Sequence, residues 1–357
     1  MHDKIVDIAL RYRFLVLILT LGTIIYGTYS YSRLPVDAFP DISPIMVPVF
    51  VEADGMAPEE IERLITFPIE STMNGLPGVT QIKSTSAFGM AVIYVYFEDS
   101  IDIYFARQIV SERLSDAMAS LPDMEEPPVL GPISTGLGQI FIYYLTLDEG
   151  TDTEGKSPTT YLRELNDWVV KYQLQTVPGV TDILSMGGHV LQYQIRINPY
   201  SLNKYSISLE ELIDAVKENN RNAGGQYLVL SSEEYLIRGI GLVATLDHIR
   251  NIHIKVFDGT PIKIGDIAEV DYGEELRRGV VSRNGEQEVV SGMVLKLFGE
   301  NTSRVIENLY KKIPEVQKSL PEGVNLYPFY EQAELVKNAT WTVKKALLIG
   351  ALLVIIT

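Results

Sequence analysis

The sequence has no cysteine among its 357 residues. Disulfide bonds and thiolate metal sites are therefore excluded, although this absence does not identify the compartment in which the protein works. The sequence also lacks a glycine-rich phosphate-binding loop, a zinc-hydrolase motif and any grouping of serine, histidine and aspartate that rises above chance. These absences argue against an enzyme, and we predict neither a catalytic site nor a bound cofactor.

Histidine is scarce as well, with four residues in the chain. His248 and His253 are five residues apart, which matches neither one face of a helix nor one face of a strand, so we interpret both as surface residues. His189 follows two glycines, and a lone histidine there is a weak candidate for a metal ligand.

One long stretch carries no charge. Residues 14–31 read FLVLILTLGTIIYGTYSY, and a helix of roughly 17–25 such residues crosses a bilayer. Basic residues flank this stretch unevenly, with Lys4, Arg11 and Arg13 before it and Arg33 after it. This excess places the N-terminus in the cytoplasm. The alternative, a cleaved signal peptide, would need a small-residue cleavage site that is missing. We predict a cytoplasmic segment at 1–13 and a first transmembrane helix at 14–33.

A second apolar stretch, ALLIGALLVIIT, ends the sequence at 346–357. These twelve residues are too few to cross a bilayer, and a buried core helix is the alternative. We interpret 340–357 as the truncated start of a second transmembrane helix, because nothing after it turns or caps the chain. Residues 34–340 then lie outside the cytoplasm. The formal net charge of −16 makes this part acidic, which disfavours nucleic acid and either attracts cations or keeps the protein soluble.

A nine-residue word occurs twice, as LPGVTQIKS at 76–84 and as VPGVTDILS at 177–185. Proline ends a helix, glycine permits a left-handed turn, and valine begins a strand. Around the first copy we predict a strand at 45–53, a helix from Pro58 that Pro68 kinks, two strands, a helix from Asp102 to Ser120 and a last strand at 127–133. The order strand–helix–strand–strand–helix–strand is the split βαβ or ferredoxin-like motif.

The second copy has a strand at 139–147 and a helix at 158–176, but the elements that should follow its word appear only at 291–323. An insertion at about 189–276 therefore interrupts it. The fold class that we predict is α+β, with tandem ferredoxin-like units, an insertion and transmembrane helices.

The insertion has signals of its own. Ser208 and Glu211 have the spacing of a capping box at the start of a helix. Residues 221–241 have two glycines near their start, Gly224 and Gly225, and indicate a projecting hairpin. Such a hairpin contacts a partner chain or remains a solvated loop.

Longer motifs accompany the repeat: LPVDAFPDIS at 34–43, GPISTGLG at 131–138, DWVVKYQLQTVPGV at 167–180, GGHVLQY at 187–193 and LRRGVVSRNGEQEVV at 276–290. Together they make the chain similar to the N-terminal part of the resistance–nodulation–division (RND) efflux permeases, in their heavy-metal branch. The resemblance covers essentially all of the chain. The motif GPISTGLG resembles the metal branch and is unlike the multidrug branch.

The resemblance implies two porter subdomains, at 34–134 and at 135–188 plus 277–330. It implies a docking subdomain at 189–276 whose hairpin reaches into the neighbouring subunit of a homotrimer. It further implies the inner membrane of a Gram-negative bacterium, with a large periplasmic part. The implied partners are a periplasmic adaptor, an outer-membrane channel and the lipid bilayer. Protons drive the export of Zn, Co and Cd or of Cu and Ag cations, and the metal ion is substrate rather than cofactor.

The chain departs from the family in length. A complete pump is about three times as long, and its proton relay uses acidic residues in later transmembrane helices, which this chain does not reach. We therefore interpret the chain as a fragment or a truncated product that is not active alone. The alternatives are a multidrug-type RND permease and a truncated, membrane-tethered binding or scaffold module.

A metal site without cysteine must use carboxylates, histidine or methionine. The resemblance implies Asp167 as a ligand in the porter cleft, and the alternative is a helix-surface pair with Lys171 one turn on. Relatives carry glutamate where this chain has Gln139, whose neutral amide is a poorer ligand, and a plain strand position is the alternative. Methionines in helix or strand patterns are interpreted as core residues: Met73, Met90, Met118 and Met293.

Overall fold

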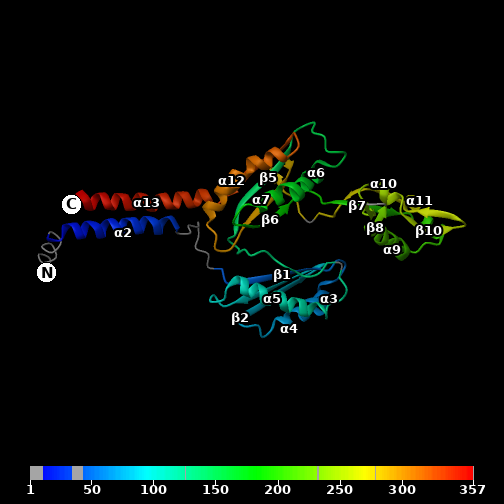
Figure 1. Cartoon of the computed structure of the whole chain (residues 1–357), viewed down its shortest axis with the longest axis horizontal. Coiled ribbons are helices and arrows are strands. Elements are labelled where there is room, and N and C mark those ends of the chain that lie inside the picture. Colours follow the sequence, from blue (N-terminus) through cyan, green and yellow to red (C-terminus); the bar gives the residue numbers. More distant parts are fainter. Residues whose placement is uncertain (1–10, 34–42, 125, 231–232, 278, 357) are drawn as a thin grey trace.

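The computed structural model describes residues 11–33, 43–124, 126–230, 233–277 and 279–356. Most of the predicted segment 1–13 and of the motif at 34–43 lies outside these residues, as does the last residue of the predicted 340–357. The described part is a mixed α/β structure. It has two four-stranded sheets with their helices, a smaller insertion, and two long apolar helices that extend from the same end of the molecule (Figure 1).

The two long helices are α2 (Arg13–Arg33) and α13 (Ala333–Ile356). Their apolar side chains are mostly exposed. Among the described residues, Arg13–Ser30 is the stretch long and apolar enough to cross a membrane by length and composition. Helix α13 begins at Ala333, earlier than the start at residue 340 that the sequence predicted. The residues from Ala333 onward (AELVKNA) include several good helix formers, which explains the earlier start.

The first unit is an antiparallel sheet in the order β2–β3–β1–β4. Its strands are β1 (Met46–Glu52), β2 (Val79–Ala87), β3 (Met90–Phe97) and β4 (Val129–Leu130). Its helical segments are α3 (Pro58–Ile61), the π-helical η1 (Glu62–Thr66), α4 (Phe67–Met73) and α5 (Ile103–Met118). Buried side chains alternate along β3, and the buried ones form a core with residues of the helices.

Local chemistry sets the bounds of these elements. Asp102 accepts hydrogen bonds from the backbone N–H of Tyr104 (2.9 Å) and Phe105 (3.1 Å), which confirms its predicted role as the cap of α5. Pro68 lies in the first turn of α4, directly after the π-helical turn, so the helix is interrupted where a kink was predicted. The last strand is shorter than predicted, because the prolines around it cannot donate to a sheet.

The second unit has the same strand order when its strands are matched in sequence, β6–β15–β5–β16, again antiparallel. Its strands are β5 (Gln139–Leu147), β6 (Val180–Met186), β15 (Val290–Lys296) and β16 (Val324–Glu331). Its helical segments are α6 (Pro158–Leu165), the π-helical η2 (Asn166–Val170), α7 (Lys171–Gln175) and α12 (Thr302–Ser319). A π-helical turn therefore interrupts the first helix of both units.

The repeated word has the same conformation in both units. Gly78 has φ +76° and Gly179 has φ +91°, and strands β2 and β6 begin at the next residue. A Cβ at Gly78 would lie 2.7 Å from Ile101, and one at Gly179 would lie 2.5 Å from Val305. The predicted left-handed turn is confirmed, and the tight packing behind it gives glycine a second reason to be there.

The insertion leaves the second unit after β6 and returns before β15. Its elements are β7 (Leu191–Ile197), α8 (Pro199–Tyr205), α9 (Leu209–Asn219), β8 (Ala223–Leu230), β9 (Glu233–Gly239), α10 (Leu246–Arg250), β10 (His253–Phe257), β11 (Thr260–Lys263), α11 (Ile264–Ile267) and β12 (Ala268–Glu274). The short strands β13 (Ser282–Arg283) and β14 (Gln287–Glu288) follow. The capping box is confirmed, since the Ser208 hydroxyl accepts from the Glu211 N–H (3.1 Å) and the Glu211 carboxylate from the Ser208 N–H (2.7 Å).

Each of the three parts has its own apolar core. One core joins the sheet and helices of the first unit, a second those of the second unit, and a third the elements of the insertion. Strands β8 and β9 pair with each other as a hairpin. Separate cores allow the three parts to keep their internal packing while they move relative to one another.

The core of the second unit depends on a close approach between two strands. Gly292 in β15 lies opposite Tyr143 in β5, and a Cβ at position 292 would lie 2.2 Å from the tyrosine ring. Tyr143 is fully buried, and its hydroxyl donates to the side-chain oxygen of Asn166 at 2.8 Å. Glycine is needed at position 292 because the ring occupies the space that a side chain would fill.

We expect Gly292→Ala to lower the free energy of unfolding of the second unit by about 2–4 kcal/mol, because overpacking and loss of the buried hydrogen bond add. Gly224→Ala is the control. Gly224 is also a strand glycine but has open space around its Cα, so we expect a change of less than about 1 kcal/mol. Urea unfolding followed by circular dichroism measures both, because this signal reports the second unit and also the insertion that carries Gly224. Equal effects of the two changes would contradict the packing argument.

Candidate functional site

The repeated word ends in a serine, and in both units this serine binds a carboxylate of the first helical segment. Ser84 in β2 donates a hydrogen bond to the carboxylate of Glu70 in α4. Ser185 in β6 donates a hydrogen bond to the carboxylate of Asp167 in η2. In each unit, a serine on an edge strand of the sheet thus binds a carboxylate of the first helical segment, although the two carboxylates are not at equivalent positions of the repeat. The candidate ligand Asp167 is one of this pair.

Asp167 lies beside β6 and is engaged by two donors. Ser185 donates to Oδ1, and Arg163 Nε donates to Oδ2 at 2.7 Å. The side chain of Asp167 is 28 % exposed, so both solvent and protein reach it. The pair with Lys171, which was the alternative from sequence, is wrong: Lys171 Nζ lies 3.3 Å from Asp182. Arg163 also lies four residues from Asp167, but in the regular helix α6 before the π-helical turn, and it pairs with the carboxylate in place of Lys171.

Behind Asp167, a chain of hydrogen bonds leads into the core. Asn166 Nδ2 donates to the Ser185 hydroxyl at 2.8 Å, and Tyr143 donates to Asn166 Oδ1. Burial, and then the negative charge of Asp167, raise the pKa of Tyr143 well above its ordinary value, so the phenol remains a donor. Asn166 is itself fully buried. These bonds fix the position of Asp167 relative to the sheet.

Gln139 is the first residue of β5 and is exposed. Its backbone oxygen accepts a hydrogen bond from Gln332 Nε2 at 2.8 Å. Gln139 and Asp167 do not meet. Gln139 is paired across the sheet with Leu295, whereas the serine that holds Asp167 is paired with Gly292 on the far side of β15. Leu295 and Gly292 are three positions apart on β15, so the pair that contains Gln139 and the pair that contains Ser185 are about 10 Å apart along the strand.

Other candidates are placed as follows. Among the described residues, no three histidine, aspartate or glutamate side chains gather closely enough to hold a metal ion. His248 and His253 are exposed, as predicted. Met73 belongs to the core of the first unit, as predicted, and Met90 and Met293 are partly buried. The prediction for Met118 is wrong, because it lies at the end of α5 and is 41 % exposed.

Sequence reasoning missed a polar cluster at the junction between the second unit and the insertion. Glu274, the last residue of β12, accepts hydrogen bonds from Ser157 (2.5 Å) and Thr160 (2.7 Å) at the start of α6. These hydroxyls lower the pKa of Glu274, and the nearby charges of His189 and Arg277 act in the same direction. His189 Nδ1 lies 3.5 Å from the same carboxylate. No local signal could reveal this cluster, because its members are far apart in the sequence.

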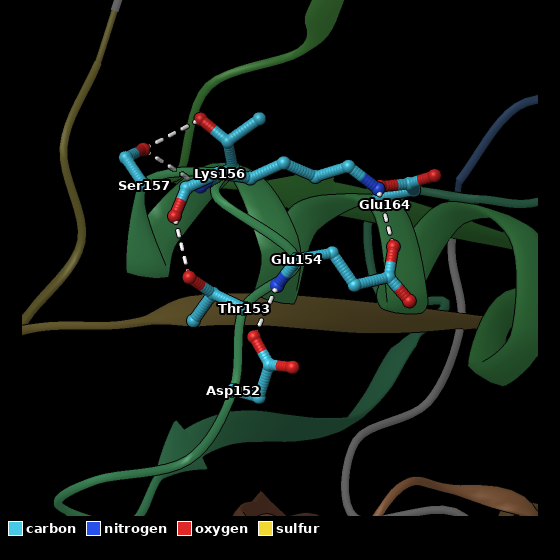
Figure 2. A network of polar contacts seen from close by, with 7 residues as sticks. Asp152, Thr153, Glu154, Lys156, Ser157 and Glu164 are labelled. Atoms are coloured by element: carbon cyan, nitrogen blue, oxygen red, sulfur yellow. Dashed lines mark hydrogen bonds and ion pairs between the residues drawn. The ribbon is translucent and has the colours of Figure 1, made fainter. Parts of the chain in front are cut away.

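The residues before α6 fix the start of the helix that carries Arg163 (Figure 2). Lys156 lies between Glu154 (3.1 Å) and Glu164 (2.7 Å). Burial alone would lower the pKa of Lys156, but hydrogen bonds to these two carboxylates outweigh burial and raise it. Ser157 caps the helix by accepting from the Thr160 N–H at 3.4 Å. The helix therefore begins at a defined residue and presents its later turns to the sheet edge.

Comparisons of the sequence with a family model and with curated proteins agree on one family of efflux proteins. A family model described as the AcrB/AcrD/AcrF family matches residues 5–357. The cation efflux system protein CzcA of Alcaligenes sp. (strain CT14) is 42 % identical over 359 residues, which cover 100 % of this chain and 34 % of that protein. The cation efflux system protein CusA of Escherichia coli (strain K12) is 38 % identical over 340 residues, which cover 95 % of this chain and 32 % of that protein.

A solved structure is similar over nearly the whole chain. The X-ray crystal structure of a heavy metal efflux pump, crystal form II, has a TM-score of 0.86 and 32 % sequence identity. The match covers 98 % of this chain and 34 % of that one. The chain thus spans about a third of the length of the relatives that it matches.

The repeated serine offers a matched test of how the two carboxylates are held. We expect Ser185→Ala to cost about 1–3 kcal/mol of unfolding free energy, because it leaves Asp167 and the buried Asn166 each short of a partner. Ser84→Ala is the control and should cost less than about 1 kcal/mol, since water replaces a bond between more exposed groups. Urea unfolding of the full chain measures both. A larger effect at position 84 would contradict the proposed network.

The junction cluster predicts a pH dependence. The pKa of Glu274 is lower in the folded state than in the unfolded state. The contribution of Glu274 to the free energy of unfolding is therefore fully present above its unfolded-state pKa, and it is lost as the pH falls through its folded-state pKa. We expect Glu274→Gln to destabilise the protein at pH 7 by about 1–2 kcal/mol, a range that is reduced because the side chain is partly exposed. The difference in stability between the variant and the parent should vanish in acid. Thermal unfolding from pH 7 to pH 3 tests this. Glu269→Gln on the same strand, which is 73 % exposed, is the control and should show no such trend.

Proposed function

The chain belongs to the AcrB/AcrD/AcrF family, and from this premise we propose that it forms the N-terminal third of a proton-driven RND permease that exports heavy-metal cations. The observation that carries the proposal is the 42 % identity to a cation efflux protein along the entire chain, through both units and the insertion. Pumps of this family are transporters and not enzymes. The transported ion is accordingly a substrate, and no resident cofactor enters the proposal.

Within this pump, the two units act as ferredoxin-like porter subdomains, at 34–134 and at 135–188 plus 277–330. The support is their common element order and their common strand order, each with helices packed on a four-stranded antiparallel sheet. The fold of a heavy metal efflux pump, at a TM-score of 0.86, supports the same assignment. Because each unit has its own core, the porter opens and closes by rigid-body movement of intact subdomains.

Helices α2 and α13 cross the inner membrane of a Gram-negative bacterium, at about 14–33 and from 340 onward. Both extend from the same end of the molecule with their apolar side chains exposed (Figure 1), and the family works in that membrane. Exposed leucine and isoleucine along a whole helix are unfavourable in water and favourable in lipid. Residues 34–340 then lie in the periplasm.

The insertion at 189–276 acts as a docking subdomain in a homotrimer. Its β8–β9 hairpin carries Tyr227 and Tyr235, which are 67 % and 50 % exposed. Exposed tyrosines on a projecting hairpin are typical of a contact surface, because tyrosine buries much area at low cost in conformational entropy. The complete assembly adds a periplasmic adaptor and an outer-membrane channel, as tripartite efflux systems of this family do.

Asp167 contributes one oxygen ligand for the transported cation, and the remaining ligands come from elsewhere in the porter. Its support is the carboxylate chemistry and the polar network that holds it in place. Carboxylate oxygen suits Zn²⁺, Co²⁺ and Cd²⁺ better than Cu⁺, which prefers thioethers. Gln139 is a separate candidate, with a neutral amide oxygen at an exposed strand start.

Metal tolerance tests this function in cells. We expect the complete gene to raise tolerance to zinc, cobalt or cadmium in a sensitive host, as measured by growth. Asp167→Asn should lower that tolerance at least about twofold, because changes even outside the ligands themselves often cost tenfold in metal affinity. Asp247→Asn, at an aspartate 78 % exposed in α10, is the control and should have no effect. Protection against detergents and dyes with unchanged metal tolerance would instead indicate the multidrug branch.

A further inference from the structure

Arg163 in α6 connects the candidate ligand to the junction with the insertion. Its Nε donates to Asp167 Oδ2 at 2.7 Å, and its Nη1 donates to the backbone oxygen of Gly187 at 2.9 Å. The Arg163 side chain is only 20 % exposed. One planar guanidinium thus joins a carboxylate of the second unit to the segment where the chain leaves for the insertion.

That segment has a conformation that few residues can adopt. Gly187 has φ +75° and Gly188 has φ +67°, between the end of β6 and the start of β7. A Cβ at Gly187 would lie 2.7 Å from the Val289 oxygen, and one at Gly188 would lie 2.7 Å from the Thr159 oxygen. Two successive left-handed glycines are a natural hinge, since glycine rotates with little steric cost. Arg163 binds this segment through the backbone oxygen of Gly187.

A metal cation and Arg163 compete for the same oxygen of Asp167. A cation that coordinates Oδ2 withdraws electron density from the oxygen that accepts from Nε, and its positive charge repels the guanidinium. The Ser185 bond to Oδ1 can persist through this exchange. Cation binding at Asp167 therefore favours a position of Arg163 away from this carboxylate.

The structure provides a place for the displaced side chain. A cavity of about 440 Å³ lies beside Arg163 and is also lined by Gly187, Gly188 and Glu275. Glu275 is exposed and offers a carboxylate within this cavity, on the chain segment that returns from the insertion. Arg277 on the same segment is already paired with Glu288 at 2.5 Å.

We propose that Arg163 is a displaceable counter-ion of Asp167, through which cation binding at Asp167 changes the hinge of the insertion at Gly187 and Gly188. The proposal rests on the role of Asp167 as a ligand in the proposed function. When a cation binds, Arg163 leaves Asp167 and loses its position at the Gly187 carbonyl, so the insertion is freed to reorient. By linkage, any contact that reorients the insertion changes the cation affinity at Asp167 by the same factor.

Metal titration of the full chain in detergent tests the counter-ion role, with Zn²⁺ as the probe and calorimetry as the readout. Arg163→Gln removes the competing charge, and we expect roughly five- to tenfold tighter Zn²⁺ binding, the size of effect expected from one ion pair. Asp167→Asn should weaken binding strongly. The matched control is Arg196→Gln, because Arg196 is 55 % exposed and pairs with Glu269 at 3.4 Å, away from Asp167.

The absence of cysteine makes the hinge directly observable. Cysteines placed at Lys217 in α9 and Lys318 in α12, both exposed, carry two spin labels without background labelling. In the otherwise unchanged chain, Zn²⁺ should shift the distance between labels. Arg163→Gln should show the shifted distance without metal, and Asp167→Asn should show no metal-induced shift. Arg163→Lys keeps the positive charge beside Asp167, so its Zn²⁺ affinity should stay near that of the parent. A lysine cannot bind Asp167 and the Gly187 oxygen together, so the distance between the two labels should shift without metal. Circular dichroism confirms that each variant is folded.

Each failure has a distinct meaning. If Asp167→Asn weakens Zn²⁺ binding but Arg163→Gln does not tighten it, the counter-ion role is wrong and the ligand role stands. If Arg163→Gln tightens binding with an unchanged label distance, the coupling to the hinge is wrong. If Asp167→Asn leaves Zn²⁺ binding unchanged, the proposal fails at its premise, while the growth assay with the complete gene still decides the transport function independently.

Discussion

The left-handed glycine between the first helix and the second strand is the constraint on which both units depend. Gly78 and Gly179 reverse the chain at a positive φ, where any added Cβ would press against Ile101 or Val305. The reversal sets the register of the strand that follows, so that the serine six residues later returns beside the helix. There Ser84 and Ser185 each bind a carboxylate. A turn that was needed for folding thus places an acidic side chain at the edge of the sheet.

The two units diverge at the next corner of the chain. In the first, only Phe88 and Gly89 separate β2 from β3. In the second, the insertion occupies the same corner, and its first and last strands pair with Leu191 opposite Glu274, so that the chain returns where it left. An insertion whose ends are already close adds little closure entropy to the parent fold. Because Ser185 lies just before this corner, Asp167 is one residue, Arg163, away from the segment where the chain leaves for the insertion.

The sequence predicted the elements better than their contacts. Local signals such as the Asp102 cap and the Ser208 capping box act within a few residues and were read correctly. The partner of Asp167 was missed because Arg163 and Lys171 both lie four residues from it, and the sequence does not show which of the two the carboxylate meets once a π-helical turn begins at Asn166. Glu274 was missed because its partners lie more than a hundred residues away, where only the folded chain brings them together.

Energetics show how such a junction can serve a pump. A charge-assisted hydrogen bond contributes about 1.5–3 kcal/mol, so the two bonds of Arg163 are comparable with the roughly 4 kcal/mol of an ion bound at millimolar affinity. Moving a two-state hinge from 1:99 to 99:1 needs about 5.5 kcal/mol of differential affinity. Under the counter-ion role that we propose, one cation at Asp167 would shift the hinge without completing the transition. If the chain forms part of a proton-driven pump, as we propose, the remaining free energy has to come from another step, and proton movement is the step that such a pump has available.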